Sequence, residues 1–438
     1  MSEHESSRKV HGPDESAQSS IGEAGAAFSA AAGPNLQGSL ALEGSTENTA
    51  SNSATTRPAR AAKQATLPYV DGVRALCALF VLVAHSWFQP SNGFYAERWM
   101  NRLGLSYAHL AVDAFIVVSG FVICLPIARQ EDRIGSVTRF FQRRAKRILP
   151  PYYAALAFAA VFGLVVAPHP TGTVWDNSLP VTWQKLLLHA TLLQNMPSEL
   201  PGGSVSYQFW SIAVEFQIYL LVPFLVPLAR RTSWALCAGA VFLVSLVVHH
   251  FLPTLDSIHH WYISLFAMGA AAARVCVRQP ERTSRWLAPG VGWLAIVLMV
   301  ILVGGHANFT RRLVWIDGLV GVGVAAVLTG LYLDPVNPKG RLERRLHAPL
   351  RRLLSSRVLA GIGVFSYSLY LVHPVLLHSI WMLVTWVGQL GGAAKMHSVP
   401  LFWLILALNP LVVGAAWLFY RAFERPFLHR APSREHTT

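Results

Sequence analysis

The sequence predicts an all-α integral membrane protein, in which a disordered N-terminal tail precedes a bundle of about ten transmembrane helices. Hydrophobic residues make up 53% of the 438 residues and charged residues only 13%, whereas soluble globular chains are about 25% charged. The hydrophobic residues lie in long runs, and about 20 apolar residues are enough to span a bilayer. Basic residues collect in the short segments between these runs, which is typical of membrane topology signals.

Ten apolar runs are counted as spans, of which the fifth and the seventh are the weakest. They lie at about 68–88, 107–128, 148–167, 209–229, 234–251, 258–277, 288–304, 312–332, 360–388 and 401–422. The membrane domain is therefore predicted to occupy residues 66–428. The apolar segment 183–195 is too short to span and is predicted to be an interfacial or re-entrant helix.

The two ends of the chain differ in composition from this domain. Residues 1–65 are rich in Ser, Ala, Gly, Thr and Asn and contain no long apolar run. Such a segment buries too little apolar surface to offset the entropy cost of ordering, so we expect a disordered cytoplasmic tail. Residues 429–438 are predicted to form a second, short cytoplasmic tail.

The orientation in the membrane follows from the basic residues between spans. Most of them follow an even-numbered span, and Arg311 and Arg312 are among the exceptions. The positive-inside rule therefore predicts a multi-pass protein of the cell (inner) membrane with both termini in the cytoplasm. The largest loop on the outer side is then 168–208, which is long enough to form the entrance to a binding site.

Composition also excludes some partners. The net charge of +14 would suit a nucleic-acid-binding protein, but a soluble protein of that class would not carry so many apolar runs. We expect the lipid bilayer as a partner and no nucleic acid. All four cysteines lie inside apolar runs without zinc-site spacing, so we expect free thiols and no bound metal. These residues are Cys77, Cys124, Cys237 and Cys276.

The first span, "DGVRALCALFVLVAHSWF" at 71–88, carries three residues that lipid does not favour: Asp71, Arg74 and His85. Asp71 lies one turn before Arg74, where an ion pair would orient the guanidinium. Eleven residues separate Arg74 from His85, which places both on one helix face and roughly 16 Å apart along the axis. Arg74 could be only a cytoplasmic anchor and His85 only an interfacial residue. Ionisable residues inside spans are usually functional, however, and histidine suits general-base chemistry.

Two more carboxylates lie inside spans. Glu215 and Tyr219 are four residues apart and share a helix face. Glu215 is either half of a structural pair or a residue that orients His85 or the acceptor. Asp113 shares a face with His109 at the outer end of the second span, and His109 is interpreted as incidental. Small residues nearby are interpreted as helix-packing residues rather than nucleophiles: Ser119, Gly120 and Ser211.

Five stretches, in order and at matching spacing, resemble motifs of the acyltransferase-3 family of integral membrane O-acyltransferases. The first has the D-G-x-R start of that family and a histidine eleven residues after the arginine. The chain departs from the usual residues of these motifs at three positions, Val73, Ala75 and Phe216. The stretches are "YVDGVRALCALFVLVAHSW" (69–87), "VDAFIVVSGFVI" (112–123), "RRAKRILPPYY" (143–153), "FWSIAVEFQIYLLVP" (209–223) and "SYSLYLVHPVLL" (366–377).

The resemblance implies an acyltransferase that moves an acyl group, usually acetyl, from cytoplasmic acyl-CoA (acetyl-CoA) to a hydroxyl, usually of a sugar or glycan. Arg74 would hold the donor phosphates with Arg144 and Arg147, the pair in the R-x-x-R motif, because guanidinium groups match phosphates well. Arg144 and Arg147 could instead be topology signals alone.

The catalytic residues implied are His85 and Glu215. His85 would deprotonate the acceptor hydroxyl as a general base, or take the acyl group covalently. Residues that would bind or orient the substrates are Asp71, Asp113, Tyr219 and His373. His373 precedes Pro374, so a structural role at a helix kink is an alternative for it.

Three other functions compete with acylation of a carbohydrate. One is acylation of a small-molecule acceptor, a hydroxylated secondary metabolite such as a macrolide. Another is a secondary transporter, which would also bury charges among ten spans, although no internal repeat is visible. The third is a membrane scaffold, which leaves the cost of burying His85 and Glu215 unexplained.

Overall fold

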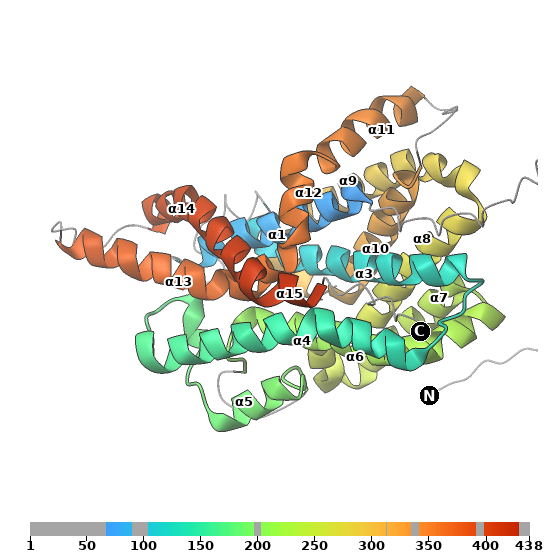
Figure 1. Ribbon diagram of the computed structural model, residues 1–438. Coiled ribbons are helices and arrows are strands. Elements are labelled where there is room, and N and C mark those ends of the chain that lie inside the picture. The colour runs from blue at the N-terminus through green and yellow to red at the C-terminus, as the bar shows by residue number, and fades with distance from the viewer. Residues whose placement is uncertain are drawn as a thin grey trace, which may run out of the picture. The chain divides into compact units, whose positions relative to one another are not determined.

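A computed structural model of the protein describes residues 67–89, 104–196, 203–311, 313–333, 341–390 and 398–428. These residues form helices joined by short connections, and none of them is in a strand (Figure 1). The predicted all-α membrane class is confirmed. The tails predicted at 1–65 and 429–438 lie outside the described residues.

The long helices account for most of the described chain. They are α1 (Pro68–Phe88), α3 (His109–Arg129), α4 (Val137–Val161), α6 (Trp210–Arg231), α7 (Trp234–Phe251), α9 (Leu287–Arg311), α10 (Leu313–Gly330), α13 (Ser366–Leu390) and α14 (Ser398–Phe419). The shorter α-helices are α5 (Trp183–Ala190), α8 (Tyr262–Arg278), α11 (Arg341–Leu354), α12 (Arg357–Val364) and α15 (Arg425–Leu428). Short 3-10 segments connect several of them, among them η3 (Val174–Ser178) and η4 (Tyr207–Phe209).

Nine helices among the described residues are long and apolar enough to cross a membrane, one fewer than expected. The expected span that is not among these nine is the sixth, 258–277, which corresponds to α8 with 17 residues. At one end of α8, Tyr262 lies beside Asp113 of α3. At the other end, Arg278 donates to Asp132 just after α3 at 3.0 Å. Thus α8 runs parallel to α3 along nearly its whole length, which is the direction expected of the sixth span beside the second.

Hydroxyl side chains define where several helices begin. Ser136 accepts a hydrogen bond from the backbone amide of Arg139 and starts α4, and Ser233 does the same for Leu236 at the start of α7. Such caps satisfy amides that have no partner within the helix. In α1 the first residue is Pro68, whose missing amide hydrogen costs nothing at that position.

Glycines let α3 and α8 approach closely. A methyl group added at Gly120 would overlap the carbonyl oxygen of Phe266, and one added at Gly269 would overlap that of Val117. The interpretation of Gly120 as a packing residue is therefore confirmed. Close backbone approach stabilises helix pairs in membranes, where lipid provides no hydrophobic drive for association.

The helices α12 and α13 lie beside α1, and α13 carries the last of the five motifs, 366–377. Asp71 at the start of α1 touches Gly363 of α12, and His85 near its end reaches His373 of α13. The chain therefore runs through α12 and α13 in the same direction as through α1. Along α14 it returns, since Phe402 near its start packs on Trp87 near the end of α1, and Glu424 after its end accepts from Ser368 near the start of α13.

The loop predicted at 168–208 is folded against α4 and α6. The hydroxyls of Tyr152 and Tyr153 donate to the carbonyl oxygens of His189 and Ala190, at 3.0 and 2.7 Å. The helix expected at 183–195 is present as α5 but ends at Ala190. The side chain of Gln217 on α6 donates to the carbonyl of Leu192 at 2.9 Å. These contacts hold the loop over one end of the bundle.

Gly269→Ala is expected to destabilise the protein by about 1–3 kcal/mol, because the added methyl meets backbone that cannot move aside without separating α3 from α8. The thermal midpoint of unfolding in detergent measures this. Gly414→Ala is the matched control, since nothing lies within 4 Å of the position. A normal midpoint for Gly269→Ala would show that the two helices do not approach this closely.

Acidification is expected to loosen the loop around His189. Its Nε2 accepts from the amide of Val205 at 3.2 Å, and burial lowers its pKa to about 4. Because the pKa in the folded protein lies below the unfolded value of about 6.5, stability is full above pH 6.5 and falls as the pH drops towards 4. The protection factor of the Val205 amide in hydrogen exchange, which corrects for slower intrinsic exchange at low pH, should fall over this range. His189→Gln, which does not titrate, should remove the dependence.

Candidate active site

A cavity opens among α1, α3, α4, α6 and α13, and it holds about 810 Å³ of empty space, counting solvent at its open side. Much of its wall is apolar, with residues such as Val112, Phe115 and Ile148. Its polar wall contains Arg74, Ser119, Arg144, Arg147, Ser211, Glu215, Tyr219, Ser366, Tyr367 and Tyr370. Five of the predicted site residues thus meet in one place, although they come from three helices.

Three guanidinium groups face this cavity. Arg144 and Arg147 are three residues apart and share one face of α4, and Arg74 joins them from α1. Arg74 has the expected ion pair with Asp71, but its N–O separation is long, at 4.0 Å. Among the described residues, no carboxylate pairs with Arg144 or Arg147 within 4.0 Å. The cavity therefore has an excess of positive charge.

The Nε atom of Arg144 is buried and has no hydrogen-bond partner. A buried donor without a partner is rare, because it forfeits the hydrogen bond that it would make to water. A charged donor is costlier still to leave unpaired. The position of this donor in the wall of an electropositive cavity favours binding of an anion there.

Glu215 is hydrogen-bonded to a side chain of its own helix, α6. The hydroxyl of Tyr219 donates to Glu215 Oε1, so the predicted shared face exists. Since that hydroxyl has only one hydrogen, the Ser119 hydroxyl donates to it in turn, at 2.5 Å. Ser119, expected to be a packing residue, is thus part of a hydrogen-bonded chain on the cavity wall. The contact expected between Glu215 and His85 is absent from the described residues.

His85 instead pairs with His373. His85 Nδ1 lies 2.7 Å from His373 Nε2, and the two rings are nearly parallel, with an interplanar angle of 12°. His373 Nδ1 lies 2.8 Å from the carbonyl oxygen of Tyr370. Carbonyl oxygens only accept, so His373 carries its hydrogen on Nδ1 and its Nε2 must accept from His85. The geometry therefore assigns the hydrogen of neutral His85 to Nδ1 and leaves a lone pair on Nε2.

Unpaired polar atoms lie next to His85. The ring of Tyr207 stands edge-on to the His85 ring with centroids 5.1 Å apart, and Gln89 follows one turn later on α1. The Tyr207 hydroxyl, Gln89 Nε2 and His378 Nε2 are buried without a hydrogen-bond partner. His378 Nδ1 is 3.3 Å from Gln89 Oε1. This cluster, the Gln89–Tyr207–His378 group, offers both donors and an acceptor to a polar ligand.

Tyr370 separates the two polar regions. It lines the cavity, its hydroxyl is 2.7 Å from Ser211 Oγ, and its ring centroid is 5.7 Å from that of His373. His85 does not line the cavity. Although Arg74 and His85 share the predicted helix face, only Arg74 lines the cavity, and His85 is reached from Tyr370 through His373.

Asp113 lies outside both regions. It is completely buried, and its neighbours are the hydroxyl of Tyr262 and the carboxyl of Asp317. His109, interpreted as incidental, lies 3.0 Å from Asp317 through its Nε2. Sequence reasoning missed Asp317, although a carboxylate inside the apolar run 312–332 was a signal of the same kind as Glu215.

Tyr370, Tyr207 and Gln89 were also missed. Tyr370 stands in the quoted late motif, between its serine and its histidine, but nothing in the sequence places it beside Ser211. All four cysteines are free, as expected.

Comparison with known proteins gives concordant matches. A family model described as an acyltransferase domain, Acyl_transf_3, matches residues 67–421. The acyltransferase MdmB of Streptomyces mycarofaciens is 28% identical over 389 residues, which cover 82% of this chain and 91% of that protein. No solved structure matches.

Two longer relatives match the same part of the chain. A putative O-acetyltransferase of Staphylococcus aureus strain COL is 22% identical over 390 residues, 82% of this chain and 57% of that protein. The putative peptidoglycan O-acetyltransferase YrhL of Bacillus subtilis is 25% identical over 390 residues, 82% of this chain and 54% of that protein. The chain therefore spans about half the length of these two relatives.

Proposed function

This chain belongs to the Acyl_transf_3 acyltransferase family, whose domain model it matches over residues 67–421, and we propose that it transfers an acyl group from acyl-CoA to a hydroxyl group. It is a multi-pass membrane acyltransferase, of the class EC 2.3.1. The donor is acetyl-CoA or another acyl-CoA bound from the cytoplasm, and the acceptor is a sugar or glycan. Both termini lie in the cytoplasm, and the membrane is the cell (inner) membrane.

The observation that carries the proposal is the unpaired cationic cavity. Coenzyme A combines phosphate groups with a long, flexible arm that ends in the thioester. Arg74, Arg144 and Arg147 would bind the phosphates, since guanidinium forks match phosphate oxygens and Arg144 Nε lacks a partner. The apolar wall would accommodate the arm. The motif arginines lie before the third span, at the end of the bundle that the positive-inside rule assigns to the cytoplasm.

His85 is the proposed general base. Its Nε2 lone pair would take the proton of the acceptor hydroxyl as the hydroxyl oxygen attacks the thioester carbonyl carbon. The carbon–sulfur bond breaks, the coenzyme leaves as a thiolate, and the proton held on His85 passes to that sulfur. His373 is a positioning residue, because its hydrogen bond keeps the hydrogen of His85 on Nδ1. For the thioester to reach His85, the Tyr370 side chain must rotate away.

The acceptor would bind at the Gln89–Tyr207–His378 group. Its unpaired donors and acceptor suit a molecule with several hydroxyl groups. A carbohydrate acceptor is also supported by YrhL, which is named a putative peptidoglycan O-acetyltransferase. Glu215 and Tyr219 lie on the donor side, so their proposed role is to position the thioester end of the donor rather than to orient His85.

Arg144→Ala is expected to raise the KM for acyl-CoA by about 10- to 100-fold while changing kcat little, because a hydrogen bond between charged groups contributes about 1.5–3 kcal/mol. Steady-state transfer of labelled acetyl groups in membranes measures both constants. Arg143→Ala is the matched control, since Arg143 is the adjacent, exposed arginine and does not line the cavity. Equal effects of the two substitutions would mean that the basic segment only sets topology.

His85→Ala is expected to lower kcat by about 100-fold or more with little change in the KM for the donor, the usual scale for a lost general base. His373→Ala should lower kcat less, because His85 remains but its tautomer is no longer fixed. Single-turnover transfer measures both, and His169→Ala, an exposed histidine, serves as the control. Near-normal turnover by His85→Ala would transfer the role of base to Glu215, the carboxylate that lines the cavity.

A further inference from the structure

Three side chains that the proposed reaction does not use meet beside the start of α8. They are His109 and Asp113 on α3 and Asp317 on α10. Each offers one potential ligand atom, and these atoms all lie within 4.8 Å of one another. His109 Nε2 and Asp317 Oδ1 are 3.0 Å apart. His109 and Asp113 are one turn apart on α3, which places both on the same face.

Asp113 gives independent evidence for a missing ligand. Its side chain has no solvent exposure, and neither of its oxygens accepts a hydrogen bond among the described residues. Its side chain lies beside the like-charged Asp317 and the hydroxyl of Tyr262. Apart from the His109 imidazole on Asp317, no basic side chain of the described residues pairs with either carboxylate. Two buried carboxylates in contact need a positive partner, because burying unpaired charge costs several kcal/mol per ion.

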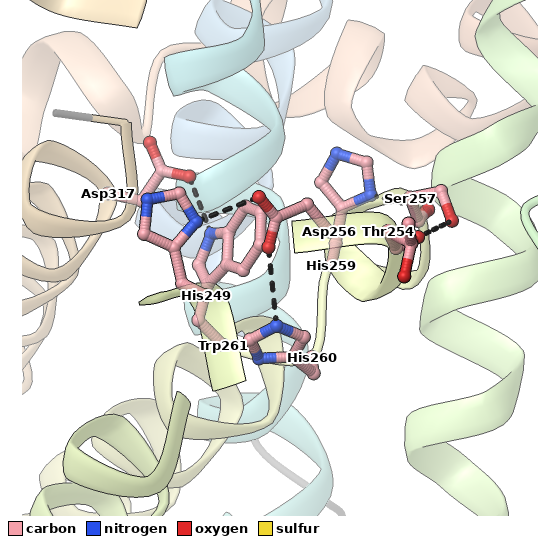
Figure 2. A network of polar contacts seen from close by, with 8 residues as sticks. All are labelled: His249, Thr254, Asp256, Ser257, His259, His260, Trp261 and Asp317. Carbon is pink, nitrogen blue, oxygen red and sulfur yellow. Dashed lines mark hydrogen bonds and ion pairs between the residues drawn. The ribbon is translucent and has the colours of Figure 1, made fainter. Parts of the chain in front are cut away.

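Asp317 is oriented as a metal ligand usually is. Its Oδ2 accepts a hydrogen bond from Trp261 Nε1 at 2.7 Å, and Figure 2 shows the indole beside this carboxylate. Because Oδ2 already accepts the hydrogen bond from Trp261, Oδ1 is the oxygen that faces His109. Hydrogen bonds of this kind from outside the ligand set fix the direction of carboxylate ligands and are a common feature of metal sites.

We propose that His109, Asp113 and Asp317 bind a divalent transition-metal ion, Zn²⁺ by preference. One imidazole and two carboxylates form a mixed nitrogen and oxygen set, which zinc accepts in tetrahedral geometry. The ion would supply the positive charge that the carboxylates lack. His109 is the partly exposed member, with 21% of its side chain accessible, so the ion enters from its side and keeps a water there. The ion would join α3 to α10.

This inference does not depend on acyl transfer, since the ion is assigned a structural role and its test does not require activity. The full-length protein, purified in detergent without chelator, is incubated with ZnCl₂, desalted and analysed for metal by elemental mass spectrometry. About one zinc per chain is expected. Asp113→Asn and Asp317→Asn keep the shape of the side chain and should each lower the zinc content at least about tenfold.

His249→Ala is the matched control. His249 forms a separate pair with Asp256 at 2.8 Å, in the loop network drawn in Figure 2, and this loop is the obvious place for adventitious zinc. The control should keep its zinc. Zinc should also raise the thermal midpoint of the wild type and of His249→Ala, but not of Asp113→Asn. If an aspartate variant fails to fold, His109→Gln replaces it in both measurements.

Two outcomes would overturn the site. If the folded wild type holds no zinc after incubation, Asp113 and Asp317 are neutralised by a shared proton instead. If His249→Ala abolishes the zinc while Asp113→Asn keeps it, the ion belongs to the exposed loop and not to the buried carboxylates.

Discussion

The cost of burying charge in a helix bundle governs this structure. Every ionisable group inside a span must find a partner, a proton or a ligand, because lipid offers none. The protein gathers such groups into separate centres: the arginine cavity, the His85–His373 pair and the Asp113–Asp317 cluster. Each centre joins helices that are distant in the sequence. The polar groups that carry function therefore also fix which helices are neighbours.

Two of these centres, the arginine cavity and the His85–His373 pair, are ordered along α1. This helix supplies Arg74 to the cavity near its start and His85 to the histidine pair near its end. Its length thus sets the separation between the place where a donor nucleotide would bind and the place where an acceptor would lose its proton. The parallel run of α12 and α13 beside it repeats this order, since Gly363 touches Asp71 and His373 meets His85.

The parts of the site that could be predicted are those that a single helix or motif encodes. The ion pair of Asp71 with Arg74 and the shared face of Glu215 and Tyr219 follow from helical spacing. The gathering of Arg74 with Arg144 and Arg147 followed from their common placement at one end of the bundle. The partner of His85 did not follow, because His373 is 288 residues away and no local pattern joins them.

Two differences from the sequence analysis have physical causes. Orientation of His85 was one of the roles considered for Glu215, but Tyr219 on the same helix bonds to Glu215 instead. Asp317 was overlooked because the hydrophobicity of its span concealed one carboxylate, and its partner His109 is 208 residues away. The number of spans was nearly right. The exception, α8, is short and rich in alanine and glycine, and it is largely enclosed by its neighbours rather than by lipid.

The position of Tyr370 bears on the insulation of the membrane. A cationic cavity on one side and unpaired polar atoms on the other would together form a wet path through the bundle, along which protons could leak. The Tyr370 ring lies on that path, because it lines the cavity and packs near His373. Its backbone carbonyl meanwhile holds His373 in place. The ring can rotate without moving the backbone carbonyl. A substrate could therefore pass Tyr370 while His373 keeps its hydrogen bonds to the carbonyl and to His85.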